Sequence, residues 1–102
     1  MLVNSLTAET NTILDNVIDF YGAKNQLTVC IEELSELIKE LCKVQRGIPN
    51  VDNIAEEMAD VKIVLAQLDI IINNHDEVEK WIKKKLDRLK HRLEEDKKKE
   101  GF

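Results

Sequence analysis

The segment NQLTVCIEELSELIKELCKV, residues 25–44, carries the pattern that decides the fold. Its apolar residues recur at spacings of three and four, the period of one face of an α-helix. These residues are Leu27, Cys30, Ile31, Leu34, Leu37, Ile38 and Leu41. Gly47 and Pro49 follow the segment, and neither residue continues a helix. The segment therefore predicts one long amphipathic helix.

Three further helices are predicted around this one. Thr7 can cap an earlier helix that ends at Gly22. A third helical pattern runs from about Asp52 to Asn73, with apolar residues around most of its circumference. Asn74, with Glu77 three residues later, resembles a capping box at the start of a fourth helix.

The four helices predict an all-α fold in a single domain of residues 1–102. We expect a four-helix bundle of antiparallel helices. The apolar stripe that the fourth helix is expected to bury comprises Val78, Ile82, Leu86, Leu89 and Leu93. Residues 94–102 form a charged tail that is expected to fray. Because so short a chain buries a limited core by itself, we expect oligomerisation to complete the bundle.

Composition and charge exclude several classes of protein. The chain has 15 basic and 20 acidic residues and a formal net charge of −5, which argues against nucleic-acid binding. The apolar stretch at residues 61–72 is interrupted by charged and polar residues, so no membrane span is expected. No secretory signal is visible, and we expect Cys30 and Cys42 to be buried, reduced and structural. Trp81 is expected to pack in the core or at an interface. The cytoplasm is the consistent compartment.

Acidic pairs repeat on the second and third predicted helices. Glu33 and Glu36 lie three residues apart, as do Glu57 and Asp60, so each pair projects from one face of its helix. Such like-charged neighbours destabilise a helix unless something compensates them. Two antiparallel helices would gather the four carboxylates, whose repulsion should raise some of their pKa values. These hard oxygen ligands suit Mg²⁺ or Mn²⁺, whereas the alternative is a solvated acidic groove.

Other metals fit the sequence poorly. Zinc sites favour Cys and His ligands, but His75 and His91 lie outside the acidic region and neither cysteine belongs to a CxxC pair. A ferritin-like di-iron centre needs Glu-x-x-His pairs, which neither histidine forms.

The motif Glu32-Glu33-x-x-Glu36, followed by Glu56-Glu57-x-x-Asp60, resembles a known family signature. It is similar to the EExxE…ExxD pattern of the MazG-like all-α nucleoside triphosphate pyrophosphatases, especially short phage-type or bacterial members. The resemblance covers roughly residues 20–90. The same superfamily includes dimeric dUTPases and phosphoribosyl-ATP pyrophosphohydrolases, so the motif indicates the reaction class more firmly than the substrate.

The resemblance implies a MazG-like bundle that hydrolyses a nucleoside triphosphate to the monophosphate and pyrophosphate with Mg²⁺, or with Mn²⁺ in its place. It implies a homo-oligomer, either a dimer or a tetramer. The residues that would hold metal are Glu33, Glu36, Glu57 and Asp60. One of these carboxylates, or Glu32 or Glu56, would orient or deprotonate the attacking water. Candidate substrate contacts are Gln26, Lys39, Lys43, Lys85 and Arg88.

Two alternatives stay open. A non-catalytic helical interaction protein could pair with a partner through the fourth helix, and an enzyme of the same fold could act on a phosphoribosyl nucleotide.

Overall fold

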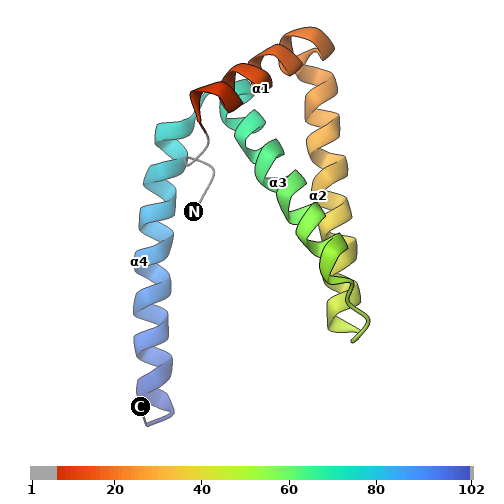
Figure 1. Ribbon diagram of the computed structural model, residues 1–102. Coiled ribbons are helices and arrows are strands. Elements are labelled where there is room, and N and C mark those ends of the chain that lie inside the picture. The colour runs from red at the N-terminus through yellow and green to blue at the C-terminus, as the bar shows by residue number, and fades with distance from the viewer. Residues whose placement is uncertain (1–6, 102) are drawn as a thin grey trace.

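The computed structural model describes residues 7–101, which form four α-helices and no strand (Figure 1). The helices are α1 (Ala8–Tyr21), α2 (Ala23–Gln45), α3 (Val51–Ile72) and α4 (His75–Lys99). The all-α prediction is confirmed for these residues. Residues 1–6 and 102 of the predicted single domain lie outside the described part of the chain.

The helix boundaries follow local backbone chemistry. Thr7 Oγ1 accepts a hydrogen bond from the Thr10 amide at 3.1 Å, which confirms the predicted cap of α1. Gly22, at φ 91°, separates α1 from α2 in a conformation that favours glycine. Asn73 ends α3 in the left-handed region at φ 56°. Asn74 is the N-cap of α4 as predicted, but the predicted capping box is not formed, because the Asn74 side chain makes no cap hydrogen bond.

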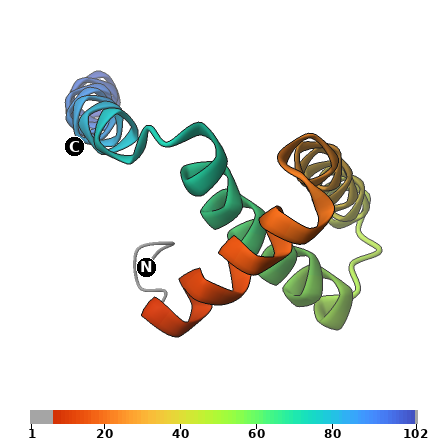
Figure 2. The same cartoon turned by 90° about the horizontal axis from the view of Figure 1, so that it is seen from above.

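The core is the antiparallel contact between α2 and α3 (Figure 1). Val61 and Val64 are buried on α3, and Cys30 Sγ donates a hydrogen bond to the Val64 carbonyl at 3.6 Å. Helix α1 crosses one end of this hairpin and contributes the buried side chain of Leu14 (Figures 1 and 2). Because these buried side chains are small, Cys30 reaches the backbone of α3.

A polar pair fixes the register of the hairpin. Gln67 Nε2 donates to Gln26 Oε1 at 2.9 Å, and both side chains are buried. In an antiparallel pair, each step forward on one helix is matched by a step backward on the other. Seven residues beyond this contact, or about two turns, Glu33 comes opposite Asp60. Three residues further, Glu36 comes opposite Glu57.

Helix α4 stands apart from the hairpin (Figures 1 and 2). None of its side chains is buried, so the expectation that its apolar stripe is covered within the chain is wrong. The four described helices consequently form a three-helix unit with α4 beside it, not an antiparallel four-helix bundle. The cause is the short turn at Asn73 and Asn74, which directs α4 away from the remaining helices.

Three smaller expectations also require correction. The segment from residue 94 does not fray, since α4 continues to Lys99 through strong helix formers, with basic residues in its last turn. Trp81 is 51% exposed, with Lys84 Nζ 5.1 Å from its ring centroid, so the core alternative is wrong, whereas packing at an interface stays a prediction. Cys42 is exposed because it lies on the side of α2 away from α3, whereas Cys30 is buried as predicted.

None of the described helices combines the length and the apolar character required to cross a membrane.

The glutamine pair predicts a non-additive effect on stability. Gln67→Leu should lower the free energy of unfolding by about 1–3 kcal/mol, because Gln26 Oε1 would remain buried without its donor. The double variant Gln26→Leu/Gln67→Leu should recover most of that loss. Urea denaturation measures both, and a double variant less stable than Gln67→Leu would contradict the assignment.

Candidate metal centre

Helical periodicity places acidic side chains on the face of α2 that packs against α3. Gln26, Cys30, Glu33, Leu37 and Glu40 are spaced by three and four residues, and therefore share this face. The positions that would carry a buried leucine in an ordinary helical hairpin are occupied by carboxylates at Glu33 and Glu40. The same contact that forms the core therefore draws acidic groups together.

Three carboxylates converge from the two helices. Glu33, Glu57 and Asp60 each present one oxygen, and these three oxygens all lie within 4.8 Å of one another. All three side chains are half-buried. Both motifs contribute, as the doubled acidic spacing predicted.

The electrostatic environment of this triad is unfavourable to charge. Burial raises the pKa of Glu33, and a hydrogen bond with Asp60 and the charges of Asp60, Glu57 and Glu36 raise it further. Burial also raises the pKa of Glu57, and the neighbouring charges of Asp60, Glu36, Glu56 and Glu40 add to the effect. The expectation that mutual repulsion raises some of these pKa values is confirmed.

The remaining predicted carboxylates lie around the triad. Glu36 is exposed, but its charge acts on both Glu33 and Glu57, so it lies at the edge of the cluster. Glu32 and Glu56 are exposed beside the motifs. The structure thus brings three of the four predicted metal ligands into one group and leaves the fourth at its border.

Glu40 is a further acidic residue that the sequence analysis did not assign to the site. It is only 5% exposed, and Lys43 Nζ donates to its Oε2 at 3.0 Å. Its Oε1 is buried without a hydrogen-bond partner, and the same is true of Glu57 Oε2. The spacing of Glu33, Glu36 and Glu40 is i, i+3, i+7, the spacing of a helix face, and that signal would have identified it.

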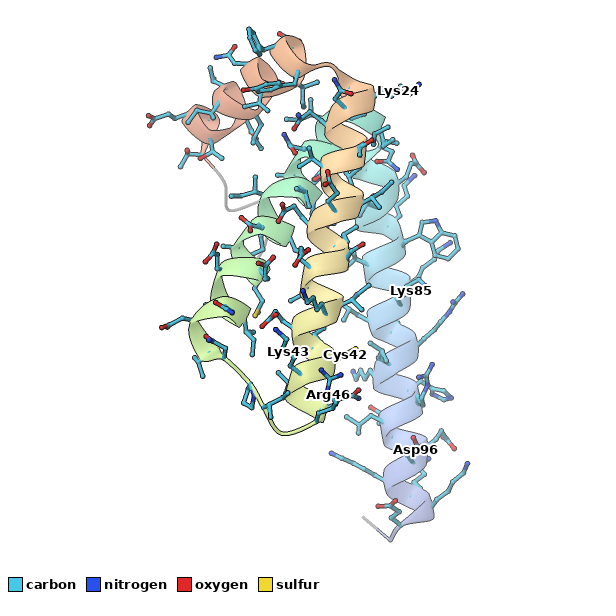
Figure 3. The ribbon with its side chains drawn as sticks, turned by 90° about the vertical axis from the view of Figure 1, so that its right-hand side faces the viewer. Lys24, Cys42, Lys43, Arg46, Lys85 and Asp96 are labelled. Atoms are coloured by element: carbon cyan, nitrogen blue, oxygen red, sulfur yellow. The ribbon has the colours of Figure 1, made fainter. Side chains whose placement is uncertain are left out.

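The predicted substrate contacts are dispersed. Gln26 is held by Gln67 in the hairpin interior, and Lys43 is held by Glu40. Lys39 is exposed on α2. Lys85 and Arg88 belong to α4, which stands apart from α2 (Figures 1 and 2). Figure 3 labels Lys43 on α2 and Lys85 on α4. The structure therefore does not gather these five residues around the acidic triad.

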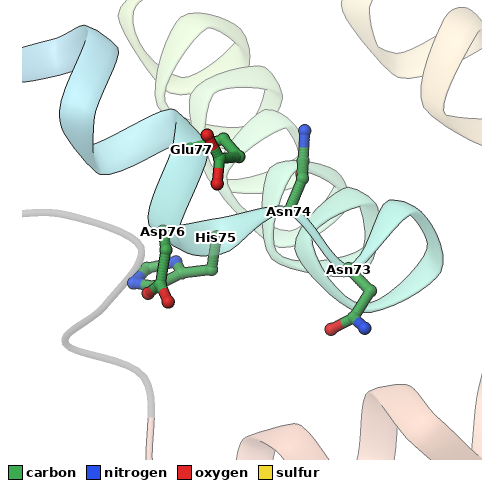
Figure 4. A pocket seen from close by; sticks show the side chains of 5 residues that line it. All are labelled: Asn73, Asn74, His75, Asp76 and Glu77. Atoms are coloured by element: carbon green, nitrogen blue, oxygen red, sulfur yellow. The ribbon is translucent and has the colours of Figure 1, made fainter.

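A separate hollow of about 330 Å³ lies where α3 meets α4 (Figure 4). It is lined by Asn73, Asn74, His75, Asp76 and Glu77. The two acids complement the positive end of the α4 dipole, which explains their presence without a ligand. His75 Nδ1 lies 3.4 Å from Asp69 Oδ2, which links the start of α4 to the end of α3.

In comparisons with known proteins, no family model, curated protein or solved structure matches this chain.

The raised pKa values predict that the metal-free protein gains stability in acid. The folded carboxyls of Glu33 and Glu57 bind protons more tightly than the unfolded ones. Their contribution to the free energy of unfolding is therefore complete below the ordinary glutamate pKa of 4.5. It is lost as the pH rises through the raised pKa of the folded state. Glu33→Gln should flatten this decline in denaturation experiments in EDTA from acid to neutral pH.

Glu94→Gln, on the exposed surface of α4, provides the matched control and should keep the wild-type slope. If wild type and Glu33→Gln lose stability equally as pH rises, the carboxylates do not repel one another in the folded state.

Proposed function

We propose that this protein is a Mg²⁺-dependent nucleoside triphosphate pyrophosphohydrolase that converts an NTP or dNTP to the monophosphate and pyrophosphate. The observation that carries the proposal is the convergence of Glu33, Glu57 and Asp60 within 4.8 Å from two separate acidic motifs. The motif resemblance supplies the reaction class, with the MazG-like family as the proposed relationship.

The donor set fits a hard divalent cation. Every candidate ligand is a carboxylate oxygen, which suits Mg²⁺ or Mn²⁺. Glu57 Oε2 and Glu40 Oε1 are buried without a donor, and a cation would satisfy such oxygens as no protein group does here. Glu33, Glu36, Glu57 and Asp60 would hold the metal, which when bound neutralises triphosphate charge and polarises the phosphoryl oxygens.

The chain's own residues would perform the remaining tasks. Glu32 and Glu56 are exposed acids beside the motifs, and either can orient a water or accept its proton. Lys39 is the exposed base nearest the first motif in sequence and can approach phosphate charge. Lys43 can do so only by leaving Glu40, because the two now form an ion pair at 3.0 Å.

The proposal includes a homo-oligomer in the cytoplasm. The resemblance implies dimers or tetramers, and the small core of the chain points in the same direction. The reduced thiols of Cys30 and Cys42 suit a reducing compartment.

A non-catalytic interaction protein is the second candidate. The observation that favours it is α4, which has no buried side chain and whose apolar stripe resembles that of a helix that binds a partner. It leaves the acidic triad unexplained, however, and for that reason ranks second. A phosphoribosyl-ATP pyrophosphohydrolase-like enzyme would use the same carboxylates on another substrate.

Substitution of the motif acids should abolish hydrolysis while leaving the fold intact. In a panel of nucleoside triphosphates with Mg²⁺, assayed for released pyrophosphate, Glu33→Gln, Glu57→Gln and Asp60→Asn should lower turnover by orders of magnitude. Glu36→Gln should do the same, because each change removes a charged ligand of nearly unchanged shape. Circular dichroism verifies that the helices persist.

Glu94→Gln is the control for this series and should retain the wild-type rate. If no nucleoside triphosphate of the panel releases pyrophosphate, the non-catalytic interaction protein is favoured. If phosphoribosyl-ATP, added to the panel, alone releases pyrophosphate, the phosphoribosyl-ATP pyrophosphohydrolase-like enzyme is favoured. Near-wild-type rates in two of the motif variants would refute the metal assignment.

Divalent cations should stabilise the protein selectively. A ligand that binds only the folded state adds about 2.7 kcal/mol at a hundredfold excess over Kd. Mg²⁺ or Mn²⁺ near neutral pH should therefore raise Tm, whereas NaCl at equal ionic strength should have much less effect. In EDTA, Glu57→Gln should melt at or above wild type, because it removes a repelling charge, but it should lose much of the gain with Mg²⁺.

Coincident melting curves in EDTA, NaCl and MgCl₂ at matched ionic strength would mean that the acids form a solvated groove.

A further inference from the structure

Helix α4 presents an unpartnered apolar stripe. Its members recur at spacings of three and four residues and are between 37% and 58% exposed: Val78, Ile82, Leu86, Leu89 and Leu93. Such periodicity is typical of a helix that packs along its length against another surface. Within the described chain, no helix covers this stripe (Figures 1 and 2).

The α2–α3 hairpin has a second unpartnered apolar surface. Ile31, Leu34, Ile38 and Leu41 follow the i, i+3, i+7, i+10 pattern on α2 and are at least 37% exposed. On α3, a parallel row of exposed side chains recurs every seven residues at Met58, Leu65 and Ile72. We call these two rows together the apolar face of the hairpin.

This apolar face lies on the side of the hairpin away from the acidic cluster. At about 100° per residue, the α2 row is turned from Glu33 in the direction opposite to Glu36. The α3 row is turned from Glu57 in the direction opposite to Asp60. Because Glu36 and Asp60 act on the same pair of carboxylates, they lie on one side of the hairpin, and the two apolar rows share the other.

The accessible surface area of the chain is larger than that of a compact monomer of the same mass. The chain exposes 8112 Å², whereas a compact monomer of 11.8 kDa exposes about 5,900 Å². Its radius of gyration is 17.2 Å, compared with about 13 Å for a compact domain of this length. The excess of about 2,200 Å² per chain matches what a subunit of an obligate homodimer buries, and exceeds the roughly 800 Å² of a standard interface.

Charge is segregated in a way that makes two copies complementary. Residues 7–74 contain 12 acidic and five basic residues, whereas α4 contains 10 basic and seven acidic residues. An α4 helix is therefore attracted to the remainder of another copy, while two hairpins repel one another.

We infer that a second copy of this chain covers both surfaces, with α4 of each copy packed on the apolar face of the other copy's hairpin. One two-fold axis satisfies both surfaces at once, since each chain supplies a stripe and receives one. A foreign partner would have to match two separate surfaces. The inference assigns the interface of the proposed homo-oligomer, and its readouts are mass and cross-linking, so it can fail while the enzyme proposal stands.

The mass in solution is the first test. Light scattering at micromolar concentration should give twice the chain mass of 11.8 kDa. Leu86→Asp should shift the protein to the monomer, because it places a charge within the α4 stripe. His91→Asp, on the opposite side of the same helix, is the matched control and should leave the dimer intact. A wild-type species of 11.8 kDa would overturn the inference.

Cross-linking tests the exchange of α4 helices between the two copies, and it does so even if Leu86→Asp fails to fold. In a Cys42→Ser background, Leu34→Cys and Leu89→Cys are made as separate variants, equilibrated together and treated with a bis-maleimide. Cys30 should stay silent, because it is buried and burial raises the pKa of its thiol. A product that joins the two variants, verified by mass spectrometry of its peptides, is the expected result.

Two controls complete the experiment. His91→Cys in place of Leu89→Cys should give little product, and equal yield would overturn the inferred face. In the double variant Leu34→Cys/Leu89→Cys, a cross-link within one chain would mean that α4 folds back on its own hairpin, which also overturns the exchange.

Discussion

The antiparallel contact between α2 and α3 is the constraint on which the rest of the structure depends. It buries the small side chains that form the core and aligns the two acidic motifs at the same level of the hairpin. Cys30 Sγ contacts the Val64 carbonyl across the hairpin, and Glu33 and Asp60 lie about one turn further along their helices, so their carboxylates are held near one another. Fold and candidate site are therefore not separate parts of this chain: one contact produces both.

The acidic residues at the α2–α3 contact lower the stability of the fold in order to form the candidate site. A protein of this size has few buried side chains, yet it uses several positions of its main interface for acids. The raised pKa values of Glu33 and Glu57 record the electrostatic cost, and the unpartnered oxygens of Glu40 and Glu57 record the lost hydrogen bonds. Unpartnered oxygens and carboxyls with raised pKa values in one place are typical of a functional site.

Much of the fold could be predicted from local signals, because helix periods and caps depend on near neighbours. Thr7, Gly22 and the 25–44 pattern predicted helix ends that agree with the structure to within two residues. The doubled motif predicted a group of four carboxylates, of which three converge. The position of α4 could not be predicted, since its stripe specifies only that some surface covers it, not whether that surface belongs to the same chain. Glu40 could not be assigned from the acidic pairs, because it belongs to neither pair and is placed near them only by the helical period. Gln26 and Lys43 are not free to contact a substrate, because each is hydrogen-bonded to another side chain of the protein. The partner of Lys43 lies three residues away, but the partner of Gln26 lies 41 residues away, and no local sequence pattern predicts so distant a contact.

The Gln26–Gln67 hydrogen bond has a consequence for the states that the chain avoids. Two apolar helices can shift along one another by seven residues and still bury similar areas. Apolar contacts alone therefore discriminate poorly between alternative registers of the two helices. In a shifted register, the buried side-chain amides of Gln26 and Gln67 would lose their mutual hydrogen bond. The free-energy cost of these unsatisfied buried groups favours the observed register over the alternatives. The hydrogen bond fixes the offset between α2 and α3. The distances between the carboxylates two turns away therefore depend on how firmly this hydrogen bond holds the two helices in register.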